Sequence, residues 1–267
     1  MRRLLKIEFR KLFHNTGFWV LLGLYLAVSL FSVFVIQEIT DQFISNANQK
    51  SPIPIPTLQL YHFPNIWQNV PYILSFFRIF LGILVMVFIC NEYSYKTIRS
   101  NIFNGMSRKE ILGSKILSFG IIAIFVTLFV FLLTLIFGLV NTPDISSANF
   151  FDKMSFIPVF FLDIFMYMCF AMLVAQLLKK AGLSIAIFLL YSYIVEKIIV
   201  YKVGDTIGQF FPLDTLNRLI PPPNIKIAQA FGVNFKDMYS AQDVIIAIAW
   251  TIIFIALNYW ILKKRDF

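Results

Sequence analysis

The chain has 267 residues, of which 59% are hydrophobic and only 14% are charged. A soluble domain needs roughly 25% charged residues to cover its surface, so this composition excludes an ordinary soluble protein and favours a chain whose main solvent is lipid. The net charge of +9 could suggest a nucleic-acid-binding protein. The basic residues gather, however, in short clusters at the ends of apolar runs, which is how orientation is set in a membrane.

Residues 3–14 stand immediately before the first apolar run. Their apolar side chains recur at helical spacing, and most of their cations share another face. This pattern predicts an amphipathic helix that lies in the membrane interface, with its cations near anionic headgroups. The alternative is a simple orientation signal without a fold of its own. The apolar residues are Leu5, Phe9, Leu12 and Phe13, and the cations are Arg3, Lys6, Arg10 and His14.

Six windows are long and apolar enough to cross a membrane, since a helical crossing needs about 20 mostly apolar residues. The first is too long for the core of a secretory signal and no small-x-small cleavage site follows it, so we expect an uncleaved span. The sequence therefore predicts an all-α integral membrane protein with one transmembrane domain of six spans over residues 1–267. The windows are about 18–38, 70–91, 111–140, 155–178, 182–201 and 243–262.

The distribution of charge predicts how these spans are oriented. Basic residues are concentrated before the first span, between the second and third, between the fourth and fifth, and after the sixth. These four regions fall on one side of the membrane, and the opposite regions carry most of the acids. By the positive-inside rule, we expect both termini to be cytoplasmic.

Two segments on the opposite side are unusual. Residues 39–69 are predicted to form a polar loop, stiffened between Ser51 and Pro56 by prolines that each fix φ and remove a hydrogen-bond donor. Residues 203–223 are apolar, but Gly and Pro interrupt them too often for a span. They predict a short re-entrant or interfacial element whose backbone is buried in protein. An ordinary folded outer loop is the alternative.

The segment between the second and third spans carries the most specific local signals. Tyr95, Ile98 and Ile102 are spaced as one face of a short helix, and Gly105 supplies a stop because glycine enters the left-handed region at little cost. Ser107 then begins a capping box with Glu110, which starts a new helix. The sequence thus predicts helix, glycine turn and new helix on the cytoplasmic side.

The same segment contains a longer motif, which runs from Glu92 through Thr97-Ile98 and residues 104–108 to Lys115. This motif resembles the permease subunits of ABC-2 type exporters, and is most similar to the small six-span permeases associated with bacitracin or lantibiotic export and immunity. In that family the second span ends in an acidic residue, and a Gly-Thr pair, a Gly-x-Ser-Arg turn and a Lys follow. Lys96 stands here where the family usually has Gly. In architecture the resemblance covers the whole chain, including short re-entrant helices before the last span.

The resemblance also implies partners and a location. Residues 92–105 would be the coupling segment that sits in a cleft of a separate ATPase subunit, with ATP and Mg bound on that partner and not on this chain. Two permease subunits, identical or related, would form the pathway in the bacterial cytoplasmic (inner) membrane. The residues implied at or near the ATPase contact are Glu92, Thr97, Ile98, Arg99 and Ile102.

Two charges fall inside the predicted spans. Arg78 and Asp163 each lie about eight residues from the outer end of a span, or roughly 12 Å deep at 1.5 Å per residue. Unpaired charges at that depth are costly, so we expect the two to pair across the bundle. The alternative is that each snorkels or meets water alone. Glu196 and Lys197, near the outer end of the fifth span, are expected to reach headgroups and to need no special role.

No motif for catalysis on this chain is present. The sequence has no G-x-x-x-x-G-K-[ST] loop to cradle ATP phosphates. The two histidines, His14 and His62, are expected on opposite sides of the bilayer, and the two cysteines, Cys90 and Cys169, lie in apolar segments. Neither a catalytic, a cofactor-binding nor a metal site is therefore expected.

The leading hypothesis is a transport subunit that exports an amphipathic peptide, a lipid or a hydrophobic drug. Its partners would be ATPase subunits, a second permease subunit and membrane lipid, and not nucleic acid. An ion-coupled secondary transporter is the alternative, in which Arg78 and Asp163 could form the coupling site. No convincing internal repeat relates the first three spans to the last three, although many secondary transporters have one. A membrane-embedded enzyme ranks third.

Overall fold

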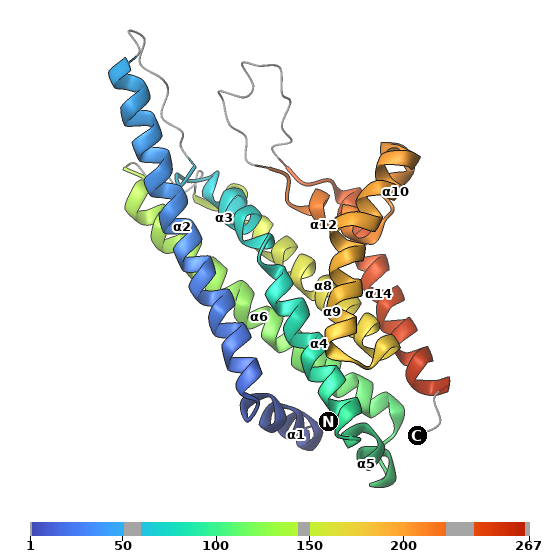
Figure 1. Ribbon diagram of the computed structural model, residues 1–267. Helices are drawn as coiled ribbons and strands as arrows, with labels where there is room; N and C mark the ends of the chain where they lie inside the picture. The colour runs from blue at the N-terminus through green and yellow to red at the C-terminus, as the bar shows by residue number, and fades with distance from the viewer. Residues whose placement is uncertain (1, 51–59, 144–149, 223–237, 265–267) are drawn as a thin grey trace.

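The computed structural model describes residues 2–50, 60–143, 150–222 and 238–264 (Figure 1). In these ranges the chain is helical and contains no strand, which confirms the predicted all-α class. The helices are α1 (Arg2–Phe13), α2 (Thr16–Lys50), α3 (Ile66–Ser75), α4 (Arg78–Ser94), α5 (Thr97–Phe103), α6 (Arg108–Asn141), α8 (Phe156–Leu178), α9 (Ala181–Leu190), the π-helical turn η1 (Tyr191–Val195), α10 (Glu196–Val203), α11 (Asp205–Gly208), α12 (Pro212–Leu219) and α14 (Ala241–Lys264).

Within the described ranges, five helical segments are long and apolar enough to cross a membrane, and the bent pair α3–α4 makes a sixth if its halves form one span. Each segment overlaps one of the six predicted windows. The fifth is continuous from Ala181 to Val203, through α9, η1 and α10. An integral membrane protein of this class is therefore confirmed.

The first span is longer than predicted. Residues 39–50 were expected to begin a polar loop, but α2 continues through them to Lys50. No Gly or Pro interrupts this stretch, and Thr40 donates from its hydroxyl to the carbonyl of Ile36. A polar sequence without breakers can therefore extend a helix that an apolar span has already nucleated. The proline-rich stretch that follows lies outside the described residues.

The second span is broken, although residues 70–91 were predicted as one helix. α3 and α4 meet at 44°, and at the break the amide of Phe77 donates to the carbonyl of Leu74 and that of Phe80 to Phe77, at 3.1 Å each. These tighter i→i−3 bonds keep the amides satisfied through the bend. The break makes Arg78 the first residue of α4.

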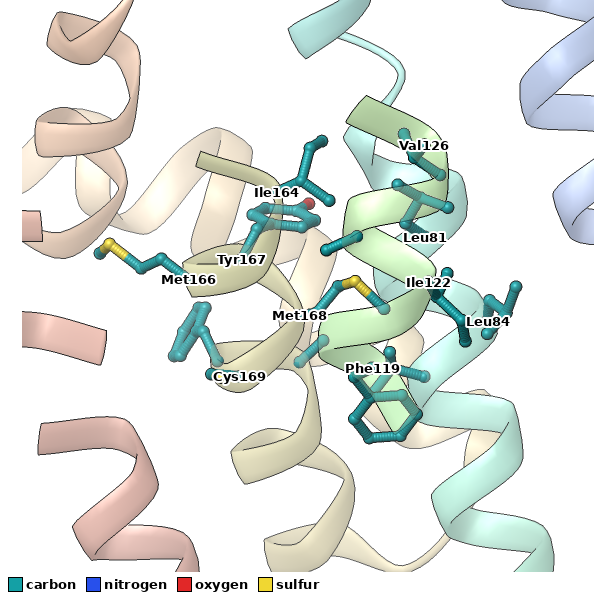
Figure 2. Close-up of a cluster of buried hydrophobic side chains, with 14 of the residues drawn as sticks. Leu81, Leu84, Phe119, Ile122, Val126, Ile164, Met166, Tyr167, Met168 and Cys169 are labelled. Atoms are coloured by element: carbon teal, nitrogen blue, oxygen red, sulfur yellow. The ribbon is translucent and has the colours of Figure 1, made fainter. Parts of the chain in front are cut away.

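α8 is the central helix of the bundle. It packs against α3, α4, α6, α9, α12 and α14, and 61% of its most apolar stretch is buried, against 17% for the segment from α9 to α10. At Gly82 an added Cβ would lie 2.8 Å from the Tyr167 ring, so glycine permits the close approach of α4 and α8. Figure 2 shows part of this core, with Leu81 of α4, Ile122 of α6 and Met168 of α8 among the labelled side chains.

The two ends of the bundle differ. Both termini lie at one end together with α1 and α5, which we call the terminal end (Figure 1). The opposite, distal end carries α3, α10, α12 and the last turns of α2. Residues 203–222 break into the end of α10, α11 and α12, and the buried side chains of α12 include Leu213, Leu216 and Leu219. The broken helical form agrees with the prediction for this segment, and its re-entrant depth stays a prediction.

Candidate functional site

The segment between α4 and α6 folds at the terminal end as helix, glycine turn and helix. Gly105 has a φ of 83°, and Ser107 and Glu110 form the reciprocal capping box that starts α6. Lys96 has a φ of 56°, in the left-handed region. That conformation suits glycine, which adopts it without a steric cost and which the resemblance led us to expect at this position. α5 therefore projects from the bundle between two left-handed residues.

The residues expected at the ATPase contact divide into two groups by exposure. The side chains of Glu92 and Ile98 are buried, and Thr97 is partly buried, with its hydroxyl donating to the carbonyl of Glu92 at 3.2 Å. Ile102 is half-buried against the core, and Arg99 is exposed. The buried and partly buried residues hold α5 in place. The outer surface of α5 is formed by exposed side chains. These are Arg99 with Phe103, whose ring lies 5.4 Å from the guanidinium, and Tyr95 just before the helix.

Glu92 belongs to a buried cluster of four charges, which we call the charge cluster: Glu8 and Lys11 of α1, Glu92 of α4 and Lys115 of α6. Lys11 Nζ lies 3.2 Å from Glu8 and 3.0 Å from Glu92. Lys115 Nζ pairs with both carboxylates, at 3.4 Å from Glu8 and closer to Glu92. Two acids and two bases balance, so the cluster is neutral, as buried charges require.

The charge cluster joins three helices at the base of α5. Because breaking a buried ion pair leaves an uncompensated charge, these contacts favour a single arrangement of α1, α4 and α6. Sequence reasoning missed Lys11 and Lys115 as partners of Glu92, and Glu8 as the second acid of the cluster. Lys115 carried a signal, because it falls in register with Ile111, Phe119 and Ile122 on the buried face of α6. A cation on an apolar helix face requires an acidic partner.

The apolar face that the sequence predicts for α1 coincides only in part with the face that is buried in the structure. Leu12 is fully buried, but Phe13 is 48% exposed, and the residue buried beside Leu12 is Glu8. Glu8 can be buried because Lys11 and Lys115 neutralise it. The helix exists as predicted, and its position in a membrane interface stays a prediction.

The structure brings Arg78 and Asp163 together toward the distal end. Arg78 Nη1 donates to Asp163 Oδ1 at 2.5 Å, and Asp163 is fully buried. Arg78 Nη2 donates to Asn217 Oδ1 of α12 at 2.6 Å, and the guanidinium lies 5.3 Å from the centre of the Tyr167 ring. One cation thus connects α4, α8 and α12. A cation at the N-terminus of α4 opposes the helix dipole, and the Asp163 carboxylate offsets that cost.

Glu196 has a structural role, and the prediction that it only reaches headgroups is wrong. Its side chain is buried, and its Oε1 accepts hydrogen bonds from the amides of Leu213 and Asp214 at 2.7 and 2.8 Å. These are first-turn amides of α12, which has no side-chain cap of its own. Glu196 therefore caps α12 from another helix. Lys197 is exposed, with its ammonium 5.9 Å from the Tyr193 ring.

In the described ranges, no group of three or more His, Cys, Asp or Glu residues is placed to hold a metal ion. Two sets of buried or partly buried ion pairs join helices of the described part of the chain, the charge cluster at the terminal end and Arg78–Asp163 toward the distal end.

A family model described as ABC-2 family transporter protein matches residues 2–267. Comparison with curated proteins finds no match. The family is that of the membrane components of ABC transporters, whose members associate with ATP-binding subunits and are not themselves catalytic. The apolar helices, the absence of a phosphate-binding loop in the sequence and the match across nearly the whole chain agree. The chain therefore belongs to the ABC-2 family of transporter proteins, as a multi-pass transmembrane permease.

Proposed function

We propose that this chain is the permease subunit of an ATP-driven exporter in a bacterial cytoplasmic membrane, with both termini in the cytoplasm. Two copies, or this chain and a related one, would form the pathway. Separate ATPase subunits would bind ATP and Mg and supply the energy. Export is favoured over import because the permeases that the chain resembles are exporters. The cargo class would be an amphipathic peptide, a lipid or a hydrophobic drug.

The observation that carries the proposal is the construction of α5. This short helix stands at the terminal end, between two left-handed residues, and its base is held by the charge cluster. Its outer surface presents Arg99 and Phe103, the latter 72% exposed. An exposed aromatic beside an arginine is the composition of an interface hot spot. To transmit force from an ATPase, a helix needs an exposed surface that the ATPase can contact and a rigid attachment to the rest of the permease, and α5 has both.

Among the residues implied at the contact, we assign two roles. Arg99 would touch the ATPase, together with Phe103. Glu92, Thr97 and Ile98 would position α5, because their side chains face the bundle, and Ile102 would pack at the boundary between the two groups.

The test is co-purification of the chain with a Walker-motif ATPase encoded beside it. The double substitution Arg99→Glu with Phe103→Ala should abolish co-purification, since both side chains are exposed and their loss leaves the fold intact. Lys202→Glu is the matched control, because Lys202 is an exposed cation at the distal end. Transport by the purified chain with an ion gradient and without an ATPase would instead support the secondary-transporter alternative and refute the proposal.

A further inference from the structure

A second feature of the distal end is a cavity of about 250 Å³ between α3, α4, α8, η1, α10 and α12. Its lining includes the cations Arg78 and Lys197 and the rings of Phe76, Tyr167 and Tyr193. No carboxylate is among its lining residues, all of which lie in the described ranges. A cavity lined by two cations and by aromatic rings suits an anion attached to an apolar body.

Both charged side chains that line the cavity are cations, and the carboxylates of Asp163, Glu196 and Asp214 lie outside its lining. Asp163 neutralises Arg78 but does not line the cavity. Glu196 lines a neighbouring cavity instead, and its Oε1 already accepts two amides of α12. Lys197 has no salt bridge within the described part of the chain, and lines both cavities. Lys197 therefore supplies the first positive charge that an anion would meet. Arg78 lines the same cavity and supplies the second.

Arg78 also has hydrogen-bonding capacity facing the cavity. Its Nη1 is committed to Asp163, but Nη2 donates only to the amide oxygen of Asn217, an exposed residue that lines the same cavity. A phosphate oxygen carries a negative charge that attracts the guanidinium, whereas the Asn217 amide oxygen is neutral, so a phosphate can replace Asn217 at Nη2. Guanidinium is also the side-chain group that best matches phosphate geometry.

We propose that this cavity binds the phosphate group of an anionic amphiphile, through Arg78 and Lys197. The volume lies below the range of roughly 300–1,000 Å³ that holds a whole drug-sized ligand, so it fits a headgroup only. The apolar part would lie outside, along Phe76 and Tyr193, which line the cavity and are 61% and 51% exposed. The site requires neither ATP nor a partner subunit, so it stands independently of the proposed export function.

The experiment measures binding of phosphatidylglycerol to the purified full-length chain, by native mass spectrometry after exchange into detergent, with phosphatidylcholine as the lipid control. Lys197→Ala should weaken binding of phosphatidylglycerol roughly twofold to fivefold, the range for loss of one ion pair made by an exposed lysine. Lys202→Ala is the matched control, since Lys202 is an exposed cation on the same helix that lines neither cavity.

A second variant acts from the opposite wall of the cavity. Asn217→Asp keeps the shape of the side chain but places a permanent carboxylate against Arg78, so it should weaken phosphatidylglycerol binding more than tenfold. Because Asn217 is exposed, this change leaves the packing of α12 intact.

Added inorganic phosphate distinguishes the two sources of the ligand. Displacement of phosphatidylglycerol from the wild-type chain by inorganic phosphate supports a free phosphate as the natural ligand. Retention of the lipid, with binding still dependent on Lys197, supports a lipid headgroup. Equal loss in Lys197→Ala and Lys202→Ala, or wild-type binding by Asn217→Asp, would show only diffuse attraction to the surface and overturn the proposal.

Discussion

Substitution of Lys115 by Met should be the most destabilising single change in the charge cluster. The Lys115 side chain is 3% exposed and pairs with both Glu8 and Glu92, whose side chains are each 4% exposed. Its loss leaves two buried carboxylates facing one ammonium, that of Lys11. Removal of one partner from a buried pair costs about 3–5 kcal/mol, because the remaining charge stays desolvated. Met approximates the length of the lysine stem, so the loss of charge dominates the effect.

Lys11→Met is the matched control, because Lys11 contacts the same two carboxylates at 3.2 and 3.0 Å. Its side chain is 26% exposed, so water already screens part of its interaction. Its loss also leaves two buried carboxylates facing one ammonium, but water reaches this side of the cluster, so the expected cost is about 1–3 kcal/mol, below that of Lys115→Met. Because both lysines contact the same two carboxylates, the difference between the two losses of stability measures the effect of burial and not the number of contacts.

A double variant, Lys115→Met with Glu92→Gln, restores neutrality, because only the Glu8–Lys11 pair keeps its charges. It should be less destabilised than Lys115→Met alone, with a coupling energy of about 1–3 kcal/mol. The measurement is the free energy of unfolding in titrations with SDS, followed by loss of helical circular dichroism. If Lys115→Met costs no more than Lys11→Met, or if the effects of the double variant add, the reasoning about a buried and balanced cluster is refuted.

Three further changes test other contacts. Exchange of Arg78 and Asp163 should recover transport lost in either single charge reversal, since the pair is preserved; failure of this rescue in a transport assay would count against a role for the pair. Glu196→Ala should weaken the first turn of α12 by about 1–2 kcal/mol, detected as faster amide exchange in residues 212–219, whereas Glu196→Gln should retain most of the protection because an acceptor oxygen remains. Lys96→Gly should raise the free energy of unfolding by about 1 kcal/mol, because glycine removes the strain of a left-handed residue; a destabilised variant would show that the lysine side chain has a contact of its own.

The membrane-spanning helices could be predicted from the sequence because their signal is local. A long run of apolar residues predicts a span whatever the rest of the chain does. The capping box at Ser107 and the turn at Gly105 are likewise determined by residues within a few positions of each other. The break between α3 and α4 had no such signal. No Gly or Pro stands at Phe76 and Phe77, and in the fold α3 packs against α6 and α8.

The ion pairs differ in how far the sequence could predict them. An unpaired Arg78 or Asp163 would have a high free-energy cost inside a membrane, so their similar depth alone indicated that the two side chains form an ion pair. Glu196 was assigned to the lipid headgroups because it stands near the outer end of the fifth span. Its partners are two backbone amides, 17 and 18 residues later in the chain. Almost every residue has a backbone amide, so the residue type does not identify such a partner. Buried carboxylates with main-chain partners are therefore one class of contact that sequence reasoning misses.

α4 connects the two polar sites of the molecule. Arg78 is its first residue, and Glu92 lies near its last, 14 residues on and thus about 21 Å away at 1.5 Å per residue. Both side chains are ion-paired to other helices, to α8 at one end and to α1 and α6 at the other. A helix fixed in this way moves as a rod, so a displacement of α5 that tilts α4 must also move the guanidinium in the wall of the distal cavity. On the proposed function, ATP-driven motion at the terminal end would then change the affinity of that cavity for an anion, and by linkage an anion bound there would change the response to ATP.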